Sequence, residues 1–143
     1  MRTTTYALLL LIGLLSGCSG NGVQYARIAN ETMTNTGSVF IGRESAWVGN
    51  AISVEVQLNG RPVAILAQGQ AVSSITRAGE NIVTIIPTGP ARLVYDPQEI
   101  RFEGTGDSNN YILIRVDHVV PGFGGEIRVV EAESKVFATA VGG

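Results

Sequence analysis

Residues 52–66 read Ile-Ser-Val-Glu-Val-Gln-Leu-Asn-Gly-Arg-Pro-Val-Ala-Ile-Leu, and this stretch decides the fold class. Apolar and polar residues alternate from Ile52 to Leu58, which is the period of a β-strand with one buried face. Asn59-Gly60 follows at once, and this pair favours a β-hairpin because a type I′ turn needs positive φ at both central residues. The sequence therefore predicts a hairpin whose returning strand covers Pro62–Ala67.

Other short β-rich runs lie on both sides of this hairpin. Strands are expected at residues 38–43, 71–76, 81–86, 92–95, 100–103, 111–117 and 127–130. Turn residues separate them at a spacing of roughly 8–12 positions, which is typical of a sandwich or a small barrel. We predict an all-β fold, a single small antiparallel β-sandwich of about seven to eight strands. The tail 131–141 stays ambiguous, because its charged first half suits a helix and Val136–Val141 suits a strand.

The N-terminal segment resembles the export signal of a bacterial lipoprotein. Arg2 precedes the uncharged run Ala7–Leu15, which has the length of a signal-peptide core and falls short of the roughly 20 residues that span a bilayer. The run ends in Leu15-Ser16-Gly17-Cys18, which resembles the lipobox. The resemblance implies cleavage before Cys18, a diacylglycerol on its thiol and an acyl chain, such as palmitate, on the new N-terminus. The alternative is an ordinary signal peptide with a coincidental cysteine.

This interpretation divides the chain into a signal peptide (1–17), a lipidated cysteine with a flexible tether (18–36) and the β-domain (37–143). The tether is polar and rich in Asn, Thr and Gly, as flexible linkers are. Ser19, rather than Asp, follows the cysteine. By analogy with enterobacterial sorting, Ser19 implies a lipid-anchored location on the periplasmic face of the outer membrane.

Composition excludes several functional classes. One His and one Cys exclude a site built on two histidines and an internal disulfide framework. Charged residues make up 15% of the chain and the net charge is −2, so the basic surface of a nucleic-acid-binding protein is absent. The negative balance also argues against electrostatic attachment to anionic lipid. We expect no enzyme activity, no metal, no nucleic-acid partner and no cofactor other than the acyl chains on Cys18.

Candidate interaction residues are aromatic and lie between the expected strands. Trp47 sits in the insert 44–50, and Phe123 in the Gly-rich loop 121–125. Trp is enriched at interaction hot spots. The alternatives are a Trp47 lid packed over the end of the sandwich and a Phe123 ring turned into the core.

Other residues with reactive groups have simpler explanations. His118 follows an expected strand, and Asp107 lies in a polar turn. Asp96 and Glu99 form a carboxylate pair that nothing in the sequence places in a cleft. We interpret His118 as an exposed strand-end residue and Asp107 as part of a solvated turn, and we assign no role to the carboxylate pair.

Residues 38–86 also resemble an uncharacterised family of small bacterial lipoproteins with a PEGA-like or transthyretin-like β-sandwich. The resemblance rests on the Asn59-Gly60 hairpin and on Ala78-Gly79, where Pro-Gly is common in the family. It implies a sandwich fold, and because the family is uncharacterised it assigns no catalytic residue. The leading hypothesis is a non-catalytic protein-interaction or structural module of the cell envelope, with an unidentified envelope protein as partner. The alternative is a periplasmic binder of a small molecule or glycan, or an inhibitor of an envelope hydrolase.

Overall fold

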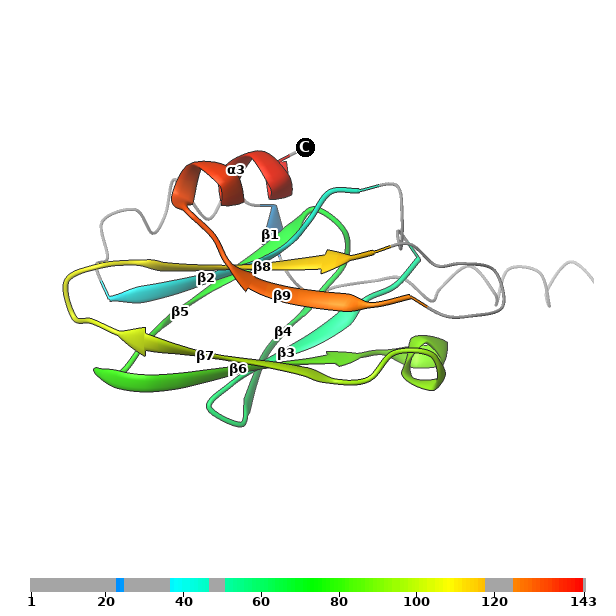
Figure 1. Cartoon of the computed structure of the whole chain (residues 1–143), viewed down its shortest axis with the longest axis horizontal. Helices are drawn as coiled ribbons and strands as arrows, with labels where there is room; N and C mark the ends of the chain where they lie inside the picture. Colours follow the sequence, from blue (N-terminus) through cyan, green and yellow to red (C-terminus); the bar gives the residue numbers. More distant parts are fainter. Residues whose placement is uncertain (1–22, 25–36, 47–50, 118–124, 143) are drawn as a thin grey trace, which may run out of the picture.

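The computed structural model describes residues 23–24, 37–46, 51–117 and 125–142, which form two facing β-sheets (Figure 1). One sheet has the order β1-β5-β2-β8-β9 and the other β4-β3-β6-β7. This arrangement confirms the predicted all-β sandwich. The elements are β1 (Val23–Gln24), β2 (Ser38–Arg43), β3 (Val54–Leu58), β4 (Arg61–Leu66), β5 (Gln70–Ile75), β6 (Gly79–Pro87), η1 (Gly89–Leu93), β7 (Gln98–Gly104), β8 (Asn110–Val116), β9 (Ile127–Glu131) and α3 (Ser134–Gly142).

The central hairpin forms as its sequence predicts. β3 and β4 pair antiparallel, and the turn residues Asn59 and Gly60 have φ values of 51° and 77°. The apolar residues of β3 are buried between the sheets, while its polar residues Glu55 and Gln57 lie on the outer face. The alternating pattern therefore sets which side of this sheet is open to solvent.

One strand pair departs from the antiparallel expectation. β2 pairs antiparallel with β5 but parallel with β8. Parallel pairing needs a long connection, and here the whole of the second sheet separates β2 from β8 in the sequence. Since a run of alternating residues does not specify the direction of its neighbour, the sequence pattern gave no signal for this pair.

The predicted strand at 92–95 is wrong, because this segment begins in a short 3₁₀ helix, η1. Pro90 stands in the first turn of the helix, where its fixed φ suits the geometry and its missing N–H costs nothing. Pro97 follows shortly after η1 and disfavours helical backbone in the residue before it. Two prolines therefore restrict this segment to a single helical turn.

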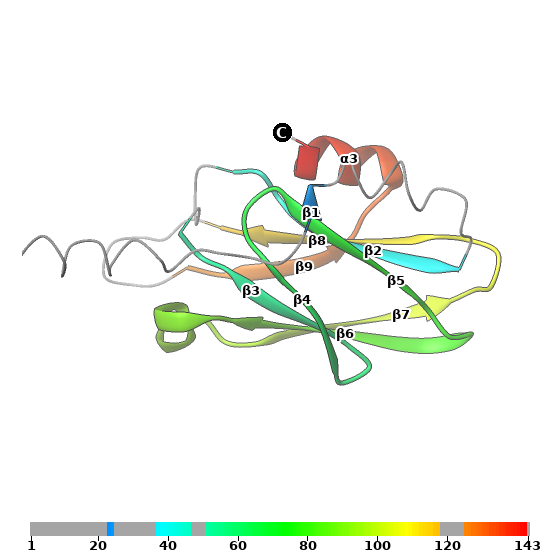
Figure 2. The same ribbon diagram turned by 180° about the vertical axis from the view of Figure 1, so that it is seen from behind.

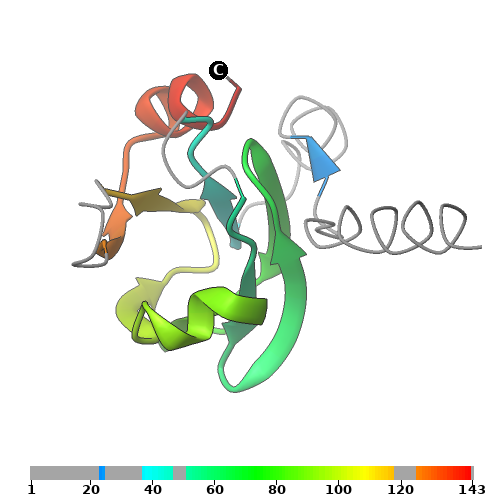
Figure 3. The same ribbon diagram turned by 90° about the vertical axis from the view of Figure 1, so that its right-hand side faces the viewer.

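The C-terminal tail is helical, so the strand alternative for Val136–Val141 is wrong. Phe137 and Val141 are one turn apart on α3 and are both buried against the outer face of the first sheet. They pack with Phe40 and Leu113 in a second apolar cluster, outside the main core between the sheets. Figure 3 shows the resulting layers, with α3 lying over one sheet.

Close packing of α3 depends on a glycine in β2. A Cβ atom at Gly42 would lie 2.5 Å from Phe137 Cζ and 2.6 Å from Val141 Cγ2. Such distances are far below ordinary van der Waals contact, so the absence of a side chain lets the helix approach the sheet.

Part of the expected tether belongs to the sandwich. Val23 and Gln24 form β1, which pairs antiparallel with the start of β5 (Figure 2). The rest of residues 18–36 lies outside the described residues, as does the segment 1–17, which we predict to be a signal peptide. Within the described ranges, no helix is long and apolar enough to cross a membrane.

We predict that Phe137→Ala lowers the free energy of unfolding by about 3–5 kcal/mol, since it removes a fully buried ring from the contact between α3 and the sheet. Urea denaturation followed by circular dichroism measures the change. Val136→Ala is the matched control, because Val136 is on the same helix but 46% exposed, and it should change stability by less than about 0.5 kcal/mol. Equal losses in the two variants would contradict the packing role of Phe137.

Candidate functional site

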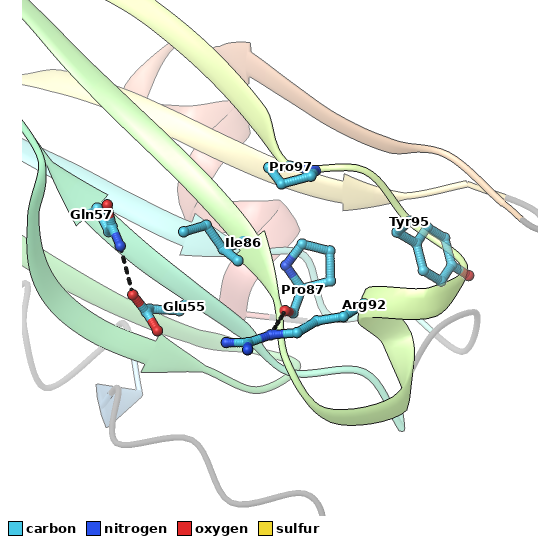
Figure 4. Close-up of a pocket in the computed structure, with 7 residues that line it drawn as sticks. All are labelled: Glu55, Gln57, Ile86, Pro87, Arg92, Tyr95 and Pro97. Carbon is cyan, nitrogen blue, oxygen red and sulfur yellow. Dashed lines mark hydrogen bonds between the residues drawn. The ribbon is translucent and has the colours of Figure 1, made fainter.

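A cleft of about 440 Å³ opens on the outer face of the second sheet, beside η1 (Figure 4). Pockets that bind small molecules usually have volumes of about 300–1,000 Å³. The lining residues are Glu55, Gln57, Ile86, Pro87, Arg92, Tyr95 and Pro97. The cleft therefore combines three polar side chains with an apolar wall of suitable size.

Two residues on the same face of β3 provide one polar side of the cleft. Glu55 and Gln57 point to the same outer face because side chains alternate along a strand. Gln57 Nε2 donates a hydrogen bond to Glu55 Oε1 at 2.7 Å. This contact fixes the plane of the carboxylate, and the second oxygen of Glu55 is left to accept from a ligand.

Arg92, which lies on η1, provides a positive charge opposite to that of Glu55. Its Nε atom donates to the carbonyl oxygen of Pro87 at 3.0 Å, which holds the side chain against the end of β6. Figure 4 shows the guanidinium group reaching past Pro87 toward the side of the cleft that contains Glu55. One positive and one negative group face the same space, so the charges of the site balance.

Tyr95 forms the buried end of this cleft. Its side chain is 6% exposed and belongs to the core between the sheets. Burial raises the pKa of the Tyr95 phenol above its ordinary value of 10.0, and the positive charge of Arg43 lowers it by a smaller amount. The phenol is therefore neutral at physiological pH and acts here as a structural wall rather than as a base.

Most of the site residues expected from the sequence lie outside the described residues. Cys18, Trp47, His118 and Phe123 are in this group. Tyr111, a further aromatic residue, packs between Phe40 and Phe137, with ring centroids 5.2 Å and 5.5 Å away. Its ring therefore supports α3 in the second cluster.

The acidic residues considered from the sequence do not gather into a centre. Asp96 and Glu99 are exposed and do not line the cleft. Beside Asp107, the Asn109 Oδ1 atom accepts a hydrogen bond from the Ser38 amide at 3.2 Å, so this polar turn fixes the start of β2. The described ranges contain no cluster of three or more His, Cys, Asp or Glu residues that would hold a metal ion.

Sequence reasoning missed this cleft because it placed a strand where η1 lies. Gly89-Pro90 was the available signal, since Gly89 has a φ of 57° and Pro90 begins the helical turn. That turn points Arg92 back over β6, so Arg92 lines the same cleft as two β3 residues more than 30 positions away in the sequence.

Comparison with known proteins gives no relative: no protein-family model, no curated protein and no solved structure matches this chain.

The raised pKa of Tyr95 predicts a decline in stability at alkaline pH. Because the folded phenol holds its proton to a higher pH than the unfolded one, its contribution is complete below about pH 10 and is lost as pH rises further. We expect unfolding free energies measured from pH 8 to 11 to fall above pH 10, and to fall less steeply in Tyr95→Phe. Identical slopes in the two proteins would contradict the assignment to Tyr95.

Proposed function

We propose that the chain is a membrane-anchored bacterial lipoprotein whose β-sandwich is a non-catalytic interaction or structural module of the cell envelope. The observation that carries this proposal is Leu15-Ser16-Gly17-Cys18 directly after the apolar run Ala7–Leu15. Cleavage before Cys18 and acylation of that residue supply the anchor. A single acyl chain binds membranes only marginally, whereas three chains make attachment essentially permanent.

The position of β1 supports a short connection between the anchor and the domain. Val23 follows Cys18 by five residues, and Val23 is already paired with Ala71. A fully extended chain covers about 3.3–3.6 Å per residue, so this connection spans at most about 18 Å. An anchored domain is therefore held close to the bilayer on this side.

A contact surface for a protein partner is offered at η1. Leu93 is 90% exposed and the adjacent Val94 is 53% exposed. Neighbouring exposed aliphatic residues on a short, proline-containing turn favour an apolar contact with an envelope protein. We place the proposed partner at this end. Trp47 and Phe123 lie outside the described residues and stay candidate contacts on sequence grounds alone.

Replacing the lipidated residue tests the anchor. In bacteria fed a labelled palmitate analogue, we expect the wild-type chain to carry the label and to sediment with membranes. Cys18→Ala should lose the label, because no thiol is left to receive the diacylglycerol. Ser16→Ala is the matched control, since it keeps a small residue before Cys18 and should retain the label. Absence of label in the wild-type chain would overturn the proposal.

The cleft beside η1 favours a second function, the binding of a small neutral polar molecule such as a sugar. Carboxylate, amide and guanidinium groups from Glu55, Gln57 and Arg92 offer both acceptors and donors to hydroxyl groups. Ile86 and Pro87 offer an apolar wall for the face of a ring. The balanced charge of the cleft favours an uncharged ligand over an anion or a cation.

Titration with N-acetylglucosamine oligomers, followed by NMR, tests this second function. We expect the amide signals of Glu55, Gln57 and Arg92 to move together, and Arg92→Gln to weaken binding by at least about tenfold, the value of one charged hydrogen bond. Arg101→Gln is the control, because Arg101 is on the same sheet, outside the cleft, in an exposed pair with Glu80. Unmoved signals would exclude a site for these sugars.

A further inference from the structure

A second cleft, of about 390 Å³, lies at the opposite end of the sandwich. It opens between the β3–β4 hairpin and the end of β5, and its walls include Arg61, Val63, Ile75 and Arg77. The nine residues of β6 separate the turn containing Arg77 from η1, a distance of about 30 Å along an extended strand. The two clefts are therefore independent sites.

The charges of this second cleft are all of one sign. Arg61 and Arg77 line it, and no carboxylate does. Within the described part of the chain, neither guanidinium is in an ion pair. Arg77 Nε donates to the carbonyl oxygen of Glu80 at 3.3 Å, while the Glu80 carboxylate pairs with Arg101 at 3.0 Å.

The nearby acidic residues do not cancel this arrangement. Glu80, Glu103 and Asp107 lie on β6, on β7 and in the turn after β7, and none of them lines the cleft. Two guanidinium groups at one concave site match the oxygen atoms of a phosphate group. The net charge of the whole chain is negative, but the charged residues that line this cleft are both positive.

An exposed aliphatic residue stands beside the two cations. Ile75 is 78% exposed at the end of β5, and half-buried Val63 lies on the facing hairpin. A surface that presents cations together with an exposed aliphatic side chain suits the boundary between lipid headgroups and acyl chains. An exposed aliphatic side chain such as Ile75 would add nothing to the binding of a small, fully hydrated anion.

The direction of β1 allows the proposed anchor to reach this end of the domain. β1 runs antiparallel to β5, so its N-terminal end points toward Ile75. Ala71, the partner of Val23, is four residues from Ile75, or about 13 Å along the strand. The stretch between Cys18 and Val23 reaches about 18 Å when extended, which is enough to place a bilayer at Ile75.

We propose that the cleft between Arg61 and Arg77 binds the phosphate headgroups of anionic phospholipids in the membrane that holds the chain, with Ile75 at the acyl boundary. The inference rests on the proposed anchor at Cys18. It orients the sandwich, with the Arg61–Arg77 end on the bilayer and η1 directed away from it.

The test uses the full lipidated protein, purified from membranes and reconstituted into vesicles. Lipid on Cys18 leaves an introduced cysteine as the only free thiol, so Ile75→Cys takes one fluorescent label. Leu93→Cys is the matched control, since Leu93 is also highly exposed, at 90% against 78% for Ile75, but lies at the η1 end. Lipids with spin-labelled headgroups quench whichever label lies at the membrane surface.

In vesicles that contain phosphatidylglycerol, we expect quenching at position 75 to exceed quenching at position 93 by at least about threefold. The excess should disappear when Arg61→Gln and Arg77→Gln are added, and in vesicles of phosphatidylcholine alone. The pair Arg115→Gln with Arg128→Gln, on β8 and β9 outside this cleft, removes the same charge elsewhere and should keep the excess.

Three results would overturn the inference: equal quenching at the two positions, stronger quenching at position 93, or an excess that survives loss of Arg61 and Arg77. Stronger quenching at position 93 would assign the membrane to η1, and equal weak quenching would leave the cleft to a soluble anion. The intact mass of the purified protein shows whether Cys18 carries lipid, so it tests the anchor separately from the orientation of the domain. A chain without lipid overturns the anchor itself, whereas a lipidated chain with the wrong quenching pattern overturns only this orientation.

Discussion

The side-chain amide of Asn81, on β6, makes the hydrogen bonds on which the end of the sandwich opposite η1 depends. Asn81 is fully buried, and its Nδ2 atom donates to the carbonyl oxygens of Arg77 at 2.9 Å and Gly79 at 2.8 Å. Its Oδ1 atom accepts from Asn59 Nδ2 at 3.0 Å. A buried amide costs free energy unless it is hydrogen-bonded, and a satisfied one specifies a single arrangement of its partners. Asn81 therefore ties together two turns from different parts of the chain.

The hydrogen bonds of Asn81 also determine where the cleft between Arg61 and Arg77 lies. Asn59 also exchanges hydrogen bonds with the backbone of Ile82, so the tip of the β3–β4 hairpin is fixed against β6. Arg61 begins the strand after that tip, and the Arg77 carbonyl is a direct partner of Asn81. A Cβ atom at Gly104 would lie 2.3 Å from the Arg77 carbonyl oxygen, so only glycine lets β7 pass this close to the turn. The positions of both arginines are thus set by the backbone, while their guanidinium groups face solvent.

The sequence predicts those features that follow from local periodicity. Alternation from Ile52 to Leu58 and the pair Asn59-Gly60 specify a strand, its buried face and its turn, because these depend on neighbouring residues alone. The sequence leaves the segment that forms α3 with two alternatives, because Phe137 and Val141 suit one face of a helix as well as a strand. Only their packing on Phe40 and Leu113, which lie far away in the sequence, favours the helix.

The candidate sites depend on long-range packing and were therefore beyond local patterns. Arg92 and Glu55 line one cleft because η1 turns back over β6. Arg61 and Arg77 line the other because Asn81 joins their turns. A buried Asn in a strand-forming run has no sequence signature that names its partners. Leu15–Cys18 is the opposite case, because its resemblance to a lipobox rests on contiguous residues and needs no fold. The resemblance predicts an anchor but no ligand.

A double-mutant cycle between Asn59 and Asn81 tests the central claim most directly. Asn59→Ala, Asn81→Ala and the double variant are compared with the wild-type chain by denaturant unfolding. If the two amides form one network, their losses are not additive, and the coupling free energy is at least about 1 kcal/mol. Losses that add to within about 0.5 kcal/mol would show that the two turns are held independently, and would contradict the account.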